Sequence, residues 1–161
     1  MNELDYNKVE KVLIKWLREK VNNAGAKGVV IGLSGGIDSS VASVLCKKAF
    51  GSEVLGIIMP CYSSGNDACD AKKVAETFSI NYIIKDLSPA LDELLCVYEG
   101  NNNKDENRMA VANIKPRLRM TTLYYYAAKN NYLVTGTDNW SELYVGYFTK
   151  YGDGGIDLTP L

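Results

Sequence analysis

The chain has 161 residues, of which 47% are hydrophobic and 23% are charged, and its formal net charge is −1. This length and composition are typical of one folded domain with its own core, and they exclude a disordered chain. Because the two signs of charge are interspersed without a basic cluster, we expect no nucleic-acid partner, and no apolar run is long enough to span a membrane.

The chain contains four cysteines and no histidine. No two cysteines form a Cys-x-x-Cys pair, so we expect reduced thiols in a cytoplasmic protein. The amino terminus leads into an amphipathic pattern without the features of a signal peptide. Because histidine is absent, Ser-His-Asp and Cys-His chemistry is excluded, and catalysis must depend on carboxylates, lysine, a metal ion or electrostatics.

Patterns of strand and helix alternate along the chain, starting with a helix predicted over residues 5–23. Short apolar runs predict buried strands at residues 29–33, 53–59, 81–87 and 132–136. Helical spacing predicts crossover helices, and Pro116 is interpreted as the start of the helix that ends at Lys129. Because parallel strands need such crossovers, this order predicts an α/β fold: a Rossmann-like open parallel sheet with helices on both faces.

The clearest chemical pattern is Ser34-Gly35-Gly36-Ile37-Asp38-Ser39, between the first predicted strand and the next helix. Two glycines allow a sharp turn with bare N–H groups, and the two serine hydroxyls and the positive end of the helix dipole point at the same volume. Such a volume suits a phosphate or pyrophosphate. The structural alternative is a glycine turn in which Asp38 only favours the start of the helix. On that helix, we expect Val41, Val44, Leu45 and Ala49 to face the core.

A second polar segment, Gly136-Thr137-Asp138-Asn139-Trp140-Ser141-Glu142, follows the last predicted strand. Carboxyl ends of parallel strands meet at one edge of a sheet, so this segment is expected near the first. Two interpretations of Glu142 are open. It either closes a capping box with Asn139 or binds Mg²⁺ opposite Asp38, because Mg²⁺ on ATP is held by one or two carboxylates with phosphate oxygens.

The sequence also contains three consecutive tyrosines, Tyr124-Tyr125-Tyr126, in the predicted helix after Pro116. Adjacent tyrosines cannot all face one core, so some of them are expected to meet another subunit or a ligand. The alternative is that they fill the core and leave one ring in solvent.

Taken together, these segments resemble the ammonia-dependent NAD⁺ synthetases, which are ATP pyrophosphatases. The resemblance depends on GLSGGIDSS at residues 32–40, NIKPRLRM at 113–120 and GTDNWSELYVGYFTKYGDGGIDLTPL at 136–161, and it covers essentially the whole chain. It implies a ligase that makes NAD⁺ from deamido-NAD⁺, ATP and ammonia through an NAD-adenylate, with AMP and pyrophosphate as the other products. Two alternatives stay open, namely another ATP pyrophosphatase and a truncated nucleotide-binding module without turnover.

The resemblance implies roles for individual residues. The implied ATP-binding residues are Gly32, Leu33, Ser34, Gly35, Gly36, Ile37, Asp38, Ser39 and Thr137. The implied Mg²⁺ ligands are Asp38 and Glu142, and the implied contacts of deamido-NAD⁺ are Arg117, Lys150 and Asp157. Asp153 is implied to take a proton from ammonium or from the attacking ammonia.

The family is also a homodimer that binds the dinucleotide at its interface. The helix from Pro116 and the tyrosine run are the implied interface in this chain. Chains of the family are longer than this one, so residues 1–161 are expected to form a single synthetase domain that lacks its C-terminal portion.

Overall fold

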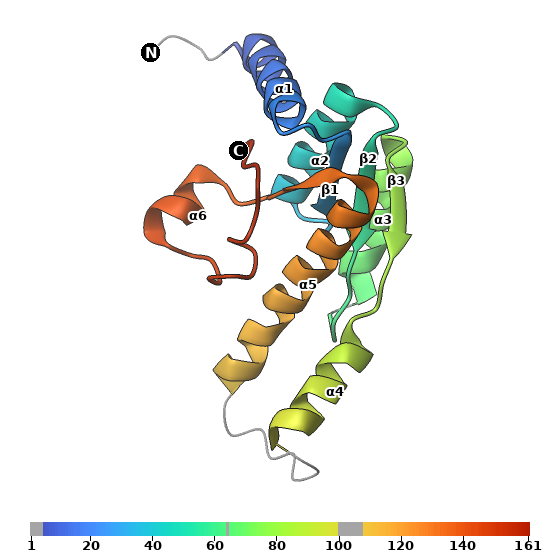
Figure 1. The fold of residues 1–161 in the computed structure, drawn as a ribbon, viewed down its shortest axis with the longest axis vertical. Coiled ribbons are helices and arrows are strands. Elements are labelled where there is room, and N and C mark those ends of the chain that lie inside the picture. Colours follow the sequence, from blue (N-terminus) through green and yellow to red (C-terminus); the bar gives the residue numbers. More distant parts are fainter. Residues whose placement is uncertain (1–4, 64, 100–107) are drawn as a thin grey trace.

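The computed structural model describes residues 5–63, 65–99 and 108–161, and Figure 1 shows a parallel sheet flanked by helices. The strands are β1 (Gly28–Gly32), β2 (Val54–Ile58), β3 (Asn81–Ile84) and β4 (Tyr132–Thr135). The helices are α1 (Tyr6–Asn23), α2 (Ile37–Phe50), α3 (Gly65–Thr77), α4 (Ser88–Glu99), α5 (Arg108–Asn130) and α6 (Trp140–Val145). The predicted α/β fold is confirmed.

The order of the strands in the sheet is β3-β2-β1-β4, and every neighbouring pair is parallel. Val29 of β1 lies opposite both Val54 of β2 and Leu133 of β4. The chain therefore moves outward from β1 to β3 and then returns to place β4 on the other side of β1. Ligands of open parallel sheets bind at such a reversal of strand order, outside the carboxyl ends of the strands.

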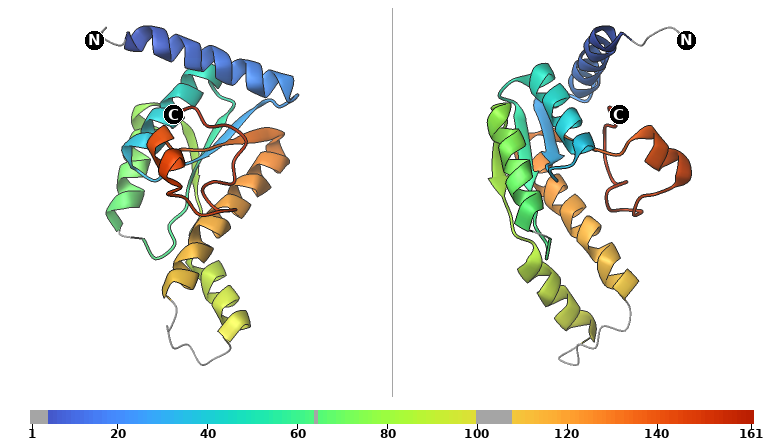
Figure 2. Two further views of the ribbon diagram at one scale, coloured as in Figure 1. Left: turned by 90° about the vertical axis from the view of Figure 1, so that its left-hand side faces the viewer. Right: turned by 180° about the vertical axis from the view of Figure 1, so that it is seen from behind.

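Two apolar layers cover the two faces of the sheet. Val29 and Ile31 of β1 pack in one cluster with residues of α1, α2 and α3, whereas Val30 packs in a second cluster with residues of α4 and α5. This division follows from the alternation of side chains along a strand. Figure 2 shows α2 and α3 on one side of the strands and α5 on the other, so the reversal at β1 lies between α2 and α5.

The prediction that Pro116 opens a helix is wrong, because α5 begins at Arg108 and contains Pro116 in its interior. A proline lacks the N–H that the helix needs there, which is why the sequence pattern suggests a helix start. The helix nevertheless continues through the proline because apolar side chains on both sides of it, including Ile114 and Leu118, pack against the second cluster. Tertiary packing thus outweighs one lost hydrogen bond.

The predicted core face of α2 is also partly wrong. Val41 is 41% exposed and Val44 is only half-buried, whereas Ala42 and Cys46 are fully buried. Small side chains at these two positions let the helix approach the sheet closely, and a pattern that favours larger apolar residues misses them. Among the described residues, no helix is both long and apolar enough to cross a lipid bilayer.

Candidate active site

The turn that leads from β1 into the first turn of α2, residues 34–39 and called the phosphate loop below, is held in shape by its own serines. The Ser34 hydroxyl donates to Ser39 Oγ over 2.9 Å, and the Ser39 hydroxyl lies 3.0 Å from the carbonyl oxygen of Gly36. The backbone N–H of Gly36 donates to Ser34 Oγ over 3.2 Å. Both hydroxyls therefore form bonds within the loop, and they do not cap the backbone N–H groups that follow.

Those donors belong to the first turn of α2. Gly36 is the N-cap of this helix, and no side chain caps it by a hydrogen bond. The following residue, Ile37, is 75% exposed. An uncapped N-terminus that faces solvent combines unpaired N–H groups with the positive end of the helix dipole, which is the arrangement that binds phosphate.

Gly35 is at the tightest point of the loop. Its φ is +86°, and a Cβ atom added there would lie 2.8 Å from the carbonyl oxygen of Asp67 and 3.0 Å from the backbone nitrogen of Ala71. Both of these atoms are backbone atoms of α3, so they cannot turn away as a side chain would. Only glycine fits this position, since the backbone angle and the close approach of α3 both exclude a side chain.

The capping box at the start of α6 is present. Glu142 donates its backbone N–H to Asn139 Oδ1 over 3.1 Å, and Asn139 donates its backbone N–H to Glu142 Oε2 over 3.1 Å. The Asn139 side chain also donates from Nδ2 to Asp38 Oδ2 over 3.4 Å. Asn139 thus connects Asp38 and Glu142, the two predicted metal ligands. The part that Glu142 plays in the capping box therefore does not exclude that it also binds Mg²⁺.

Asp138 is a member of this site that the sequence interpretation did not assign. The residue is only 6% exposed, and its Oδ2 has no hydrogen-bonding partner among the described residues. Burial, and after it the negative charges of Asp153 and Glu142, together raise the pKa of Asp138 to about 6. The spacing of residues in the sequence does not indicate that Asp138 is buried, because its burial depends on how the final loop packs.

The raised pKa of Asp138 predicts that the folded protein loses stability as the pH increases from about 4 to about 6. The folded state binds the proton more tightly than the unfolded state, so the contribution is full below pH 4 and lost above pH 6. We expect Asp138→Asn to increase the free energy of unfolding by about 2 kcal/mol at pH 7.5 and to change little at pH 4. Urea unfolding of both proteins at the two pH values measures this difference.

Asp70→Asn is the matched control for this experiment. Asp70 is exposed and pairs with Lys73 on the surface of α3. Its substitution should leave the pH dependence of stability as it is in the parent protein. Equal pH dependence of the parent protein and of the Asp138→Asn variant would contradict the assigned pKa.

A cavity of about 380 Å³ lies at the carboxyl ends of β1, β2 and β4. Its apolar wall includes Leu33, Met59 and Leu123, and its polar lining includes Thr137 and Asp153. The cavity therefore brings Ser34 of the phosphate loop together with the segment after β4, as the position of both segments after strands predicted. It also includes the final loop, residues 146–158, whose place the order of the strands did not predict, whereas residues 35–39 and Glu142 do not line it. The Asp153 side chain is held there by the backbone N–H of Thr149, which donates to Asp153 Oδ1 over 2.9 Å.

Arg119 is a second residue that the sequence interpretation missed. It lines the cavity, donates from Nε to the carbonyl oxygen of Met59 over 3.2 Å, and lies 3.4 Å from Ser63 Oγ through Nη2. The arginine is thereby fixed where β2 ends, with its positive charge beside the apolar part of the cavity. The helical pattern of the sequence does not indicate that the Arg119 side chain lines the cavity.

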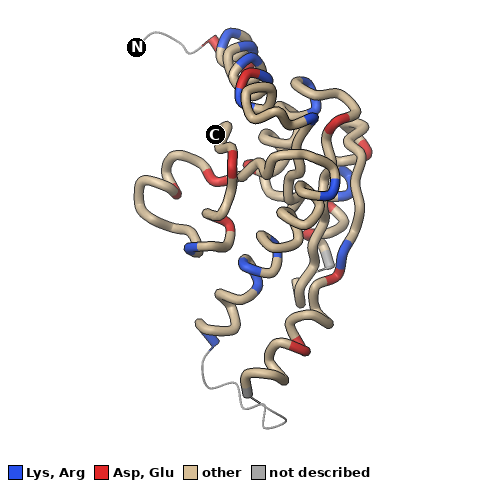
Figure 3. Tube along the Cα trace, viewed as in Figure 1, with Lys and Arg blue, Asp and Glu red and all other residues tan. Residues whose placement is uncertain are grey.

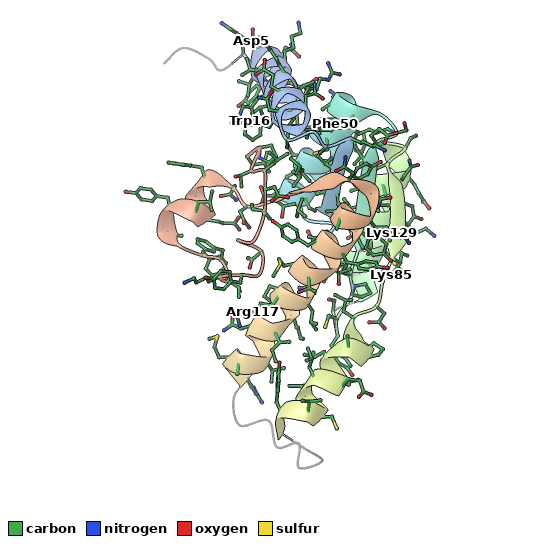
Figure 4. All side chains as sticks on the ribbon, in the orientation of Figure 1. Asp5, Trp16, Phe50, Lys85, Arg117 and Lys129 are labelled. Atoms are coloured by element: carbon green, nitrogen blue, oxygen red, sulfur yellow. The ribbon has the colours of Figure 1, made fainter. Side chains whose placement is uncertain are left out.

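The three residues implied to contact deamido-NAD⁺ do not line this cavity. Arg117 lines a separate groove between α4 and α5 and donates from Nε to the carbonyl oxygen of Lys150 over 3.3 Å. Figure 4 labels Arg117 on α5, beside the final loop. Lys150 Nζ lies 5.1 Å from the centre of the Tyr151 ring. Asp157 accepts from the Tyr124 hydroxyl over 2.9 Å and from the backbone N–H of Val134 over 2.8 Å.

Charges are distributed unevenly around the site. Residues 136–161 contain four carboxylates and one lysine, and Figure 3 shows acidic positions along the chain between β4 and the C-terminal end. The final loop returns to β4, where the backbone N–H of Gly136 donates to the carbonyl oxygen of Leu158 over 2.8 Å. This return brings the acidic positions of the loop back to the end of the sheet, close to the phosphate loop.

The tyrosine run is divided between core and solvent. Tyr124 and Tyr126 are half-buried beside the second cluster, whereas Tyr125 is 61% exposed. The rings of Tyr125 and Tyr126 meet edge to face with their centres 5.1 Å apart. This arrangement agrees with the core-filling alternative, and a role of these rings at an interface stays a prediction.

Comparisons with known proteins identify the relatives of the chain. A sequence profile of the family described as NAD synthase matches residues 9–161. The NH₃-dependent NAD⁺ synthetase of Carboxydothermus hydrogenoformans is 51% identical over 154 residues, which are 96% of this chain and 63% of that protein. The corresponding protein of Finegoldia magna is 49% identical over 98% of this chain and 64% of its own length. The chain thus spans somewhat less than two thirds of these relatives.

Solved structures of two synthetases also match almost the whole chain. The NH₃-dependent NAD synthetase from Campylobacter jejuni, in complex with nitrate ion, matches with a TM-score of 0.90 at 36% identity, over 99% of this chain and 68% of that one. The NMN synthetase from Francisella tularensis matches with a TM-score of 0.91 at 37% identity, over 99% of this chain and 65% of that one.

Proposed function

Because the chain belongs to the NAD synthase family, we propose that it carries the adenylating centre of a ligase that makes NAD⁺ from deamido-NAD⁺, ATP and ammonia, in the cytoplasm. The observation that carries this proposal is a single cavity lined by Ser34 of the phosphate loop, by Thr137 and by Asp153. A phosphate-binding loop and a carboxylate that face the same space provide what adenylation and amide formation require.

ATP is proposed to lie across the carboxyl ends of the strands. The apolar wall formed by Leu33, Met59 and Leu123 suits a nucleobase, and the first turn of α2 suits the β- and γ-phosphates. The carboxylate of deamido-NAD⁺ attacks the α-phosphorus, and the bond to the leaving pyrophosphate breaks. The N–H groups of residues 37–39 stabilise the charge that accumulates on the departing oxygens.

Asp38 and Glu142 are proposed to hold Mg²⁺. The fit is good because Asn139 hydrogen-bonds to one oxygen of each carboxylate, which positions both side chains at the mouth of the phosphate loop. Two carboxylates together with phosphate oxygens form the usual environment of Mg²⁺ on a nucleotide. When bound, the ion supplies charge neutralisation for the phosphates, and the chain supplies its position.

Amide formation is proposed to depend on Asp153. The Asp153 carboxylate takes one proton from ammonium, and the lone pair of the resulting ammonia attacks the acyl carbon of the adenylate. The bond to AMP then breaks, and the new amide nitrogen releases its second proton to water. One oxygen of Asp153 is held by the backbone of Thr149, so the side chain has a defined direction without a second charged residue. A positioned carboxylate can serve as the general base in a chain without histidine.

The proposal is tested by offering isotopically labelled ammonia together with ATP, Mg²⁺ and deamido-NAD⁺. Incorporation of the label into the amide of NAD⁺, with stoichiometric AMP and pyrophosphate, would support the ligase. Binding of ATP without formation of any of these products would instead support a nucleotide-binding module. Release of pyrophosphate with other acceptors but not with deamido-NAD⁺ would support a different ATP pyrophosphatase.

A second candidate substrate is the corresponding mononucleotide. The match to the Francisella NMN synthetase, with a TM-score of 0.91, is as close as the match to the Campylobacter NAD synthetase, with 0.90. The fold similarity therefore does not favour the dinucleotide. The sequence relatives named NAD⁺ synthetases, at 51% and 49% identity, do favour it. An assay that offers deamido-NAD⁺ and the mononucleotide together with labelled ammonia shows which of the two products carries the label.

Asp38→Asn is expected to weaken ATP binding in the presence of Mg²⁺ by about tenfold to a hundredfold, because a charged ligand is replaced by a neutral one. Calorimetric titration with ATP, with and without Mg²⁺, measures the effect. Without Mg²⁺, the variant should bind ATP about as well as the parent protein, which serves as the internal control. If ATP binding by the variant depends on Mg²⁺ as much as ATP binding by the parent protein does, Asp38 is not a Mg²⁺ ligand.

A homodimer with deamido-NAD⁺ at the interface is also proposed. The groove between α4 and α5 supports it, because Leu94, Tyr98, Ile114 and Leu118 give the groove an apolar lining with Arg117 at the same surface. Such a lining is typical of surfaces that become buried on association. Sedimentation equilibrium with and without deamido-NAD⁺ tests the assembly, and a monomer in both conditions would contradict it.

A further inference from the structure

The final loop follows α5, and Figure 2 shows this part of the chain beside the helix. Residues of α5 that are four positions apart, about one helical turn, meet successive residues of the loop. The three contacts are Pro116 with Gly152, Met120 with Gly155, and Tyr124 with Asp157. The first two are close packing, since a Cβ atom added to either glycine would lie 2.9 Å from Pro116 Cβ or 3.0 Å from Met120 Cγ. The third contact is a hydrogen bond to a carboxylate, and it ends the track.

Tyr124 is the member of the tyrosine run that makes this hydrogen bond. Its hydroxyl donates to Asp157 Oδ1 over 2.9 Å, and the backbone N–H of Val134 donates to Asp157 Oδ2 over 2.8 Å. Burial, and after it the hydrogen bond to Asp157 and the charge of that carboxylate, raise the pKa of Tyr124 to about 12. The hydroxyl therefore keeps its proton at neutral pH, and both oxygens of Asp157 are fixed by neutral donors, one from α5 and one from β4.

These two bonds orient Asp157 but leave it able to bind a ligand. The residue is exposed, and an ionised carboxylate can accept about four hydrogen bonds, so about two of its lone pairs are left. None of the ion pairs between described residues includes Asp157, so no lysine or arginine neutralises its charge there. An exposed, oriented carboxylate of this kind suits the hydroxyl groups of a nucleotide sugar.

We propose that Tyr124 is a positioning residue for deamido-NAD⁺: its hydroxyl fixes the direction of the Asp157 carboxylate, which accepts a hydrogen bond from a sugar hydroxyl of the dinucleotide. This inference rests on the proposed function and on the expected contact between Asp157 and that substrate. Tyr124 does not touch the substrate. It orders the Asp157 side chain before the substrate arrives, so that this ordering no longer costs binding free energy.

Tyr132 provides a matched control, because it makes the same kind of bond far from the site. Its hydroxyl donates to Glu53 Oε2 over 2.8 Å, and burial followed by the hydrogen bond and charge of Glu53 raises the pKa of Tyr132 to about 12. Tyr132 is the first residue of β4, whereas the cavity lies at the carboxyl ends of the strands. Tyr132→Phe therefore removes an equivalent hydroxyl at the opposite edge of the sheet.

The kinetic test compares Tyr124→Phe with Tyr132→Phe. We expect Tyr124→Phe to increase the KM for deamido-NAD⁺ by about tenfold, the size expected for one hydrogen bond to a charged group, and to change the KM for ATP by less than about twofold. Tyr132→Phe should change neither KM by more than about twofold. If Tyr124→Phe increases both KM values, or if the two variants behave alike, the hydroxyl only stabilises the fold and the inference is wrong.

The binding test does not depend on turnover, and it asks whether Tyr124 acts through Asp157. Calorimetric titration with deamido-NAD⁺ compares Tyr124→Phe, Asp157→Asn and the double variant with the parent protein. The asparagine Oδ1 can still accept the backbone N–H of Val134, so the loop should keep its place. We expect Tyr124→Phe to weaken binding by about tenfold in the parent protein but by less than about twofold in the Asp157→Asn background. Equal losses in the two backgrounds would overturn the inference.

The inference and the proposed function fail in distinguishable ways. If deamido-NAD⁺ binds with this coupling but labelled ammonia enters no product, the positioning role of Tyr124 stands and the ligase assignment is wrong. If labelled NAD⁺ forms while Tyr124→Phe keeps the KM of the parent protein for deamido-NAD⁺, the ligase stands and the role of Tyr124 is wrong. If the parent protein does not bind deamido-NAD⁺, both are wrong.

Discussion

Replacing Gly35 with alanine is expected to reduce ATP affinity by at least about a hundredfold and to destabilise the protein by about 2–4 kcal/mol. A non-glycine residue at φ +86° costs about 1–3 kcal/mol on its own. The new methyl group would also lie 2.8 Å from the carbonyl oxygen of Asp67, so either α3 or the loop must move. Because the loop precedes the N–H groups of α2, its displacement should disrupt the proposed phosphate site.

Gly36→Ala is the matched control, one residue away in the same loop. The φ of Gly36 is −73°, an angle that every residue adopts, and the nearest atom to an added Cβ is Ser34 Oγ at 3.4 Å. We expect ATP affinity to change by less than about fivefold and stability by less than about 1 kcal/mol. Calorimetric titration with ATP and urea unfolding of both variants measure these effects. Similar losses in the two variants would show that glycine is not specifically required at position 35.

The sequence predicts the architecture well because the strands are short, contiguous apolar runs. Val29, Val30 and Ile31 are all fully buried, as expected for a strand covered on both faces, and their continuity separates them from helical patterns. The order of strands and helices then leaves few topologies for a parallel sheet. The capping box of Asn139 and Glu142 is also local information, and the predicted spacing is confirmed.

What the sequence does not predict are features that depend on contacts between distant segments. Pro116 has the local pattern of a helix start, and only the packing of α5 against the sheet carries the helix through it. Arg119 points into the cavity because the carbonyl oxygen of Met59, 60 positions earlier in the chain, accepts from it. Such long-range contacts leave no periodic signal in the sequence.

The raised pKa of Asp138 is likewise a property that the sequence does not predict. This residue is one of several carboxylates in the last part of the chain, and Asp153 and Asp157 are exposed whereas Asp138 is buried. The difference arises when the final loop returns to β4, because this return covers the segment after the strand. The residue with the most perturbed carboxyl pKa in the site is therefore recognisable only from the folded chain.

Asp153→Asn is expected to lower the rate of amide formation by about 10²–10⁴-fold while leaving adenylation nearly unchanged. The asparagine Oδ1 can still accept the backbone N–H of Thr149, so the loop should keep its conformation. What is lost is the ability to take a proton from ammonium. Rapid-quench measurement of pyrophosphate in the first turnover reports adenylation, and the subsequent formation of labelled NAD⁺ reports the step in which nitrogen enters.

Whether Asp153→Asn slows adenylation, amide formation or both decides the role of Asp153. Asp153→Ala, which also removes the hydrogen bond to Thr149, should add a loss of stability and impair both steps, because the loop that lines the cavity is no longer fixed. If Asp153→Asn slows both steps equally, Asp153 acts by shaping the loop. If it slows only the second step, and raising the pH restores part of that rate by increasing the fraction of free ammonia, the carboxylate acts as the base.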